Sequence, residues 1–145
     1  MAKSFKNSTP VDIKLRTSHT LDGDVDHYQL QTKGEVVFVN GHYYIHYSDS
    51  DEAGTTDTTV KLHKDGNLTI IRKAAAESRM TFDTDTRTRF NYQTPYGAML
   101  LEIATHRLEI AYNTKPFSGE AGVSYDLYNG SQKLGDYTMN LTFKV

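Results

Sequence analysis

One stretch of this sequence decides the fold: Glu35-Val36-Val37-Phe38-Val39-Asn40-Gly41-His42-Tyr43-Tyr44-Ile45-His46-Tyr47. Residues typical of β-strands stand on both sides of Asn40-Gly41, and this dipeptide tolerates the positive φ angles of a two-residue hairpin turn. The stretch therefore predicts two antiparallel strands in which Val39 pairs with His42 and Val36 pairs with Ile45.

The register also separates the two faces of this hairpin, because successive side chains of a strand point to opposite sides. We expect the more apolar face to be buried, and it carries Val36, Phe38, Tyr43, Ile45 and Tyr47. The opposite face carries Val37, Val39, His42, Tyr44 and His46.

The same alternation recurs along the chain. A second hairpin is predicted around Lys64-Asp65-Gly66, whose three-residue loop would pair Leu62 with Leu68. Further strands are expected at residues 11–16, 78–82, 88–92, 98–104, 107–112, 121–128 and 136–145. Only Ala74-Ala75-Ala76-Glu77 looks helical, for about one turn.

The count is nine or ten antiparallel strands joined by short turns. So many strands in one meander must close or fold over, because open edges promote aggregation. We predict an all-β fold, a closed up-and-down barrel, with a sandwich as the alternative. The 145 residues suit a single domain, 1–145, with a loosely ordered segment at 1–10.

Composition narrows the function classes. Thr, Tyr, Val, Phe and Ile supply about a third of the chain, as is typical of sheets. The chain has no cysteine, which excludes thiolate chemistry and Cys-ligated metals. A formal charge of −2 gives no electrostatic footprint for nucleic acid. We expect no cofactor, no membrane segment and a cytoplasmic location.

Residues 90–99, Phe90-Asn91-Tyr92-Gln93-Thr94-Pro95-Tyr96-Gly97-Ala98-Met99, are the most distinctive in the chain. With Gly54-Thr55-Thr56 and Arg107-Leu108-Glu109-Ile110, they resemble the YwiB-like family of Gram-positive bacteria, a domain of unknown function. The resemblance spans about residues 11–143. The resemblance implies a calycin-type, lipocalin-like barrel with a central cavity. It does not imply any particular activity, because the family has none assigned. One departure is Lys73-Ala74-Ala75-Ala76, where the family leads us to expect a glycine.

The four residues Thr94-Pro95-Tyr96-Gly97 have a structural explanation. Proline at the second position and glycine at the fourth are typical of a β-turn. We therefore assign Thr94, Pro95, Tyr96 and Gly97, like Asn40 and Gly41, to the structural framework.

Arg72 is the most informative single residue. It shares strand parity with Leu68 and Ile70 and would face the barrel interior opposite Thr58. An inward arginine is costly unless an anion or several acceptors meet it. The ligand-binding candidates are therefore Arg72 and the inward tyrosines Tyr43, Tyr47, Tyr92 and Tyr125, with a solvated Arg72 at the barrel rim as the alternative.

Two patterns suggest metal sites and fail on spacing. Asp22-Gly23-Asp24-Val25-Asp26 has acids where a calcium loop needs them, but lacks the later glycine and glutamate, and is expected to be an acidic connecting loop. His42 and His46 would span roughly 13 Å along a strand, too far for one zinc ion. We predict no metal site.

Three functions remain open. The first is a non-enzymatic binder of a small, anionic or amphipathic molecule inside the barrel. The second is an interaction or scaffold module with a filled barrel. The third is an enzyme using His106, Arg72 or the acidic residues Asp49, Asp51 and Glu52, although no spacing places an acid beside a base. The apolar outer face of the 35–47 hairpin also suggests a homodimer contact.

Overall fold

Two tight turns set the register of the two predicted hairpins. In the computed structural model, which describes residues 8–145, Asn40 and Gly41 have φ angles of 53° and 87°. Val39 pairs with His42 and Val36 with Ile45, as predicted. Leu62 pairs with Leu68 around the Lys64–Gly66 loop, which confirms the second hairpin.

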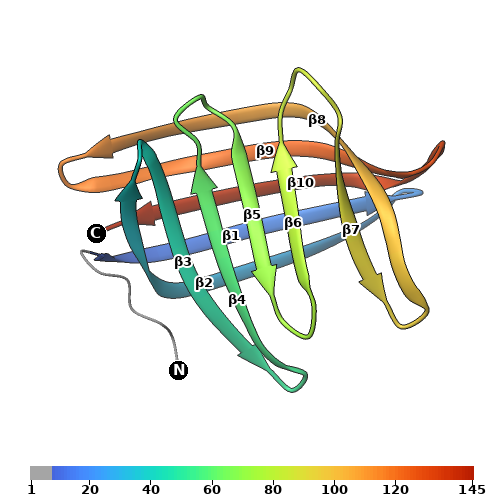
Figure 1. The fold of residues 1–145 in the computed structure, drawn as a ribbon, viewed down its shortest axis with the longest axis horizontal. Helices are drawn as coiled ribbons and strands as arrows, with labels where there is room; N and C mark the ends of the chain where they lie inside the picture. The colour runs from blue at the N-terminus through green and yellow to red at the C-terminus, as the bar shows by residue number, and fades with distance from the viewer. Residues whose placement is uncertain (1–7) are drawn as a thin grey trace.

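Within residues 8–145, ten antiparallel strands follow one another around the sheet in the order β6-β5-β4-β3-β2-β1-β10-β9-β8-β7 (Figure 1). Their bounds are β1 Thr9–Leu21, β2 Asp24–Val39, β3 His42–Asp51, β4 Gly54–Leu62, β5 Leu68–Lys73, β6 Glu77–Phe82, β7 Thr88–Thr94, β8 Gly97–Thr114, β9 Phe117–Asn129 and β10 Gln132–Lys144. This is an all-β, nearly closed barrel, so the predicted fold class is confirmed.

The barrel is flattened, with two groups of strands crossing each other (Figure 1). The long strands β8, β9, β10, β1 and the first part of β2 run along one layer, and β3–β7 cross in front of them. The core lies between them and is filled by apolar side chains from both layers. The largest fully buried ones are Phe82, Phe143, Ile45, Leu68, Ile103, Leu141, Val60 and Val123.

Closure is incomplete at one place. The strands β6 and β7 stand at the two ends of the strand order, and no ladder joins them in the described part of the chain. Instead, the side chain of Thr88 donates a hydrogen bond to the backbone carbonyl of Thr81. The two strands are close at the turn between them and diverge away from it (Figure 1).

Glycines allow the long strands to change partner. β2 pairs with β1 up to Val36 and with β3 from Glu35 onward. At Gly34, beside this changeover, an added Cβ would lie 2.3 Å from the backbone oxygen of His46. Real Cβ atoms do not approach a backbone oxygen so closely, so only glycine fits this corner.

Four expectations need correction. Phe38 was expected to be buried. It lies on the inner face of β2 but close to the end of this strand, so its side chain is 58% exposed. Residues 74–76 form a bend, and Glu77 begins β6, so no helical turn forms there. The acidic segment is a tight turn at Asp22-Gly23, while residues 24–26 belong to β2.

The fourth correction concerns residues 98–104 and 107–112, which form the single strand β8. The predicted loose segment 1–10 divides as well: residues 1–7 lie outside the described part, and Thr9 and Pro10 pair with β2.

Candidate functional site

Arg72 lies near the end of β5, between two neighbouring strands. It pairs with Thr58 of β4, as predicted, and with Ser78 of β6, and it is half-buried. Its positive charge acts on the hydroxyl groups of Tyr28, Tyr47 and Tyr125. Among residues 8–145, no carboxylate forms an ion pair with its guanidinium group. The arginine charge is therefore not neutralised by a direct protein partner in the described structure.

Arg72 opens onto a pocket of about 300 Å³. The pocket is bounded by β1, β2, β5, β9 and β10, and its lining is polar and aromatic: Thr17, Ser18, His19, Asp26, His27, Tyr28, Arg72, Tyr125, Tyr137 and Thr138. We call it the Arg72 pocket. Its volume is at the lower limit for small-molecule sites.

Three stacked rings form one side of the Arg72 pocket. His19, Tyr137 and Tyr125 are cross-strand neighbours on β1, β10 and β9. The ring centroids of His19 and Tyr137 are 4.3 Å apart, and those of Tyr137 and Tyr125 are 5.1 Å apart. Phe82 packs against Tyr125 from the core at 4.7 Å. The stack makes this wall rigid, since each ring is held by the next.

The tyrosines of this region remain protonated at neutral pH. Burial raises the pKa of Tyr125 to about 12, against the opposing effect of Arg72. Burial also raises the pKa of Tyr47 and of Tyr137. Their hydroxyl groups are therefore O–H donors. Together with a guanidinium group, such donors recognise carboxylate or phosphate oxygens.

The structure brings together only part of the predicted set. Arg72, Tyr47 and Tyr125 lie near one another, as the charge of Arg72 on both tyrosines shows. Tyr92, on β7, is 51% exposed and lies at the edge of this group, where its hydroxyl group contributes to the raised pKa of Tyr137.

Tyr43 lies elsewhere, four residues before Tyr47 on β3. It packs in an aromatic cluster against Phe38, Phe117 and Tyr112, with ring centroids 4.7, 4.9 and 5.2 Å away. It therefore belongs to the other end of the strand and is separate from the Arg72 pocket.

The residues Thr94, Pro95, Tyr96 and Gly97 lie at one turn of the sheet. Pro95 and Tyr96 form the turn between β7 and β8, with Thr94 paired to Gly97. The hydroxyl group of Thr94 donates to the Gly97 carbonyl at 2.7 Å and accepts from the Tyr96 backbone N–H at 3.1 Å. Tyr96 is fully exposed.

A second polar cluster lies on the outer face, around a bulge that sequence reasoning missed. The β8–β9 register shifts between Thr105 and Arg107, so His106 is the extra residue. Its Nε2 atom is 2.6 Å from Oδ2 of Asp126, a carboxylate that is only 5% exposed. The Nζ atom of Lys133 lies 3.6 Å from the same oxygen and 2.7 Å from Asp136.

This cluster does place an acid beside a base, contrary to the sequence-based expectation. It lacks the rest of a catalytic arrangement, however. Ser124, on the same face of β9, accepts a hydrogen bond from Nε of Arg107 at 3.3 Å, whereas His106 contacts Asp126. We interpret the cluster as a structural clasp that holds the bulge of β8 against β9 and β10.

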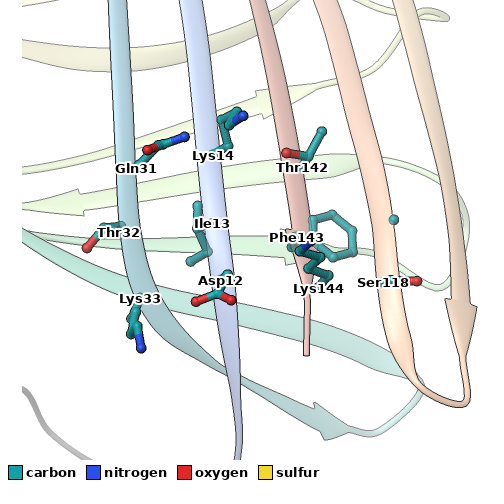
Figure 2. Close-up of a pocket in the computed structure, with 11 residues that line it drawn as sticks. Asp12, Ile13, Lys14, Gln31, Thr32, Lys33, Ser118, Thr142, Phe143 and Lys144 are labelled. Atoms are coloured by element: carbon teal, nitrogen blue, oxygen red, sulfur yellow. The ribbon is translucent and has the colours of Figure 1, made fainter.

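A groove with a volume of about 720 Å³ lies on the outer face of β1, β2, β9 and β10 (Figure 2). Its charged side chains are Asp12, Lys14, Lys33 and Lys144, all exposed. Ile13 and Phe143 also border it but are 2% exposed, because their side chains belong to the core. The groove is thus a solvated lysine-rich surface on the opposite side of the sheet from Arg72.

In the comparison with family models, residues 13–141 match a domain of unknown function, DUF1934. The chain belongs to the DUF1934 family. A curated relative, the uncharacterised β-barrel protein YwiB of Bacillus subtilis, is 21% identical over 140 residues, covering 97% of this chain and 96% of the relative.

The crystal structure of YwiB from B. subtilis superposes on this DUF1934 chain with a TM-score of 0.81. The match covers 96% of this chain and 93% of YwiB at 21% sequence identity. At this identity the likeness shows a shared barrel fold, which confirms the family resemblance.

Two further observations complete the DUF1934 site description. Within residues 8–145, no cluster of three or more His, Cys, Asp or Glu side chains is arranged to hold a metal ion. The same residues include no helix with the length and apolar character required to span a membrane.

Proposed function

We propose that this DUF1934 protein is a non-enzymatic carrier or sensor of a small molecule with an anionic group. The anion binds at the polar end of the barrel, against Arg72 and the hydroxyl group of Tyr125, with the buried Tyr47 behind Arg72. This use of one barrel end is typical of lipocalin-like proteins. The ligand is small, because buried side chains fill the middle of the barrel.

The observation that carries this proposal is the state of Arg72. A half-buried guanidinium group without an ion pair loses hydration and gains little in return. An oxyanion in the Arg72 pocket would supply the missing charge, and protonated phenols would supply further hydrogen bonds. The site therefore favours a ligand with a carboxylate or phosphate over an uncharged one.

The test is binding of a series of small carboxylic acids, from acetate to 3-phenylpropionate, followed by amide chemical shifts in NMR spectra. We expect shifts at residues that line the Arg72 pocket. Arg72→Met should weaken binding roughly tenfold or more, as expected for a hydrogen bond between charged groups. Arg79→Met is the matched control, because Arg79 lies on the adjacent strand and is exposed.

Two results would overturn the proposal. One is that no acid of the series binds and that no small molecule accompanies the natively purified protein in mass spectrometry. The other is that the Arg72 and Arg79 variants bind equally well.

A second candidate function is an interaction module, and the filled barrel favours it. Phe38 and Tyr112 are exposed beside Tyr43 at the other end of the barrel, where they offer an aromatic contact surface. Phe38→Ser with Tyr112→Ser would abolish recovery of a protein partner in a pull-down if this function holds, and would leave acid binding unchanged.

A further inference from the structure

The Arg72 pocket holds charges of both signs. Asp26, on β2, lines the same pocket as Arg72 on β5. Asp26 pairs with His19 of β1, and Tyr28 lies two residues further along β2. The side chains of all three residues therefore lie on one face of the sheet. In the described residues, Asp26 forms no ion pair with Arg72 or with any other cation. A basic and an acidic group thus face one small space without neutralising each other directly.

The neighbouring carboxylate, that of Asp49, has a hydrogen-bond partner, which distinguishes it from the carboxylate of Asp26. The hydroxyl group of Tyr28 donates a hydrogen bond to Oδ2 of Asp49 at 3.2 Å. Asp26 is therefore the carboxylate of the pocket lining that is open to a ligand.

We propose that the ligand is a zwitterion, an amino carboxylate of the size of one free α-amino acid. Its carboxylate pairs with Arg72, and its ammonium group pairs with Asp26. This inference rests on the proposed function, since it assigns a second charge to the same ligand.

Charge complementarity supports this class over the alternatives. A simple anion would be attracted by Arg72 and repelled by Asp26. A simple amine would be attracted by Asp26 and repelled by Arg72. A zwitterion satisfies both groups at once. The pocket volume of about 300 Å³ matches a compact ligand of this kind. The stack of His19, Tyr137 and Tyr125 beside it suits an apolar or aromatic side chain.

The experiment compares three probes that share a phenyl group: L-phenylalanine, 3-phenylpropionate, which lacks the amine, and phenethylamine, which lacks the carboxylate. Binding to the full-length protein is followed by NMR titration. We expect phenylalanine to bind roughly fivefold or more tightly than either analogue, as for one additional exposed charge pair.

The variant Asp26→Asn should remove this preference. Phenylalanine binding falls roughly fivefold in it, while 3-phenylpropionate binds as well as before or more tightly. Asp22→Asn is the matched control, because Asp22 is a nearby exposed acid in the turn that does not line the pocket. It should leave all three affinities unchanged. Amide spectra of both variants verify that the barrel is folded.

Each alternative result has a defined meaning. If 3-phenylpropionate binds as tightly as phenylalanine, and does so through Arg72, the zwitterion proposal fails while the anion-binding function stands. If phenylalanine binds equally well to Asp26→Asn and to the natural protein, the assignment of Asp26 fails. If none of the three probes binds up to its solubility limit, this inference is overturned, and the carboxylic acid series judges the broader function separately.

Discussion

Replacing Gly34 by alanine tests whether the corner of β2 shapes the barrel. The new Cβ would lie 2.3 Å from the backbone oxygen of His46 and 2.7 Å from Cδ1 of Ile13. Neither atom can yield easily, since the oxygen belongs to β3 and Ile13 is 2% exposed in the core. Normal contact would require a displacement of about 1 Å between packed strands. Overpacking of this kind costs about 1–3 kcal/mol, and the rigid backbone places this case at about 3 kcal/mol or above.

Gly122→Ala is the matched control for Gly34→Ala. Its added Cβ would approach Nη1 of Arg107 and Oδ1 of Asn140, at 3.0 and 3.1 Å. These are flexible side-chain ends that can move aside, so we expect a change below about 1 kcal/mol. Urea unfolding followed by far-ultraviolet circular dichroism gives the free energy of unfolding of both variants. For a chain of this size, 3 kcal/mol corresponds to a loss of roughly 6–12 °C in Tm. If Gly34→Ala is as stable as Gly122→Ala, the explanation of this corner is wrong.

Two further predictions concern the tyrosines and the outer surface. Burial raises the pKa of Tyr125 from its ordinary value of 10.0 to about 12 in the native protein. Between these values the unfolded chain loses the proton and the native protein keeps it, so stability falls as the pH rises, by about 2.7 kcal/mol for a shift of two units. Tyr125→Phe should show a smaller loss of the free energy of unfolding between about pH 10 and pH 12, measured with urea, and an equal loss would contradict the assignment. The second prediction is a homodimer through the outer face of the 35–47 hairpin, where Val39 is 44% exposed. Sedimentation should then depend on protein concentration and should lose this dependence in Val39→Lys, whereas a monomer at every concentration would exclude the contact.

Much of the fold was predictable where a turn fixes the register. Asn40-Gly41 determines which residues face each other on β2 and β3, and Gly66 does so on β4 and β5, because both turns need positive φ at defined positions. Inward Ile45, Val60 and Leu68 follow from those pairings by simple alternation.

The first half of β2 was missed although a signal was present. Asp22-Gly23 is a turn dipeptide of the same kind, with φ angles of 52° and 85°. The acids on both sides suggested a loop, while the pairing of His19 with Asp26 shows a polar strand. This error hid Asp26 and Tyr28, two residues of the Arg72 pocket.

Other features depend on contacts that no local pattern shows. The bulge at His106 exists because β8 and β9 shift by one residue, and it brings together side chains twenty positions apart. Phe38 follows the correct alternation, but alternation does not say where along a strand the barrel ends. The pairing of Arg72 with Thr58 was predictable, since its strand is short and its register is fixed by the loop at Gly66.

The missing ladder between β6 and β7 also determines how the molecule can deform. A barrel whose neighbouring strands are all joined by backbone ladders keeps its circumference, because any widening must break a row of backbone hydrogen bonds. Here the two strands are joined by one side-chain hydrogen bond, worth about 1 kcal/mol, and by the packing of Phe82 and Phe90 in the common core. Arg72 pairs with Ser78 on β6, the strand that borders this seam, so a shift of β6 would also move one wall of the Arg72 site. Arg79 and Arg89 on the two free edges meanwhile discourage a second molecule from adding its own strand there.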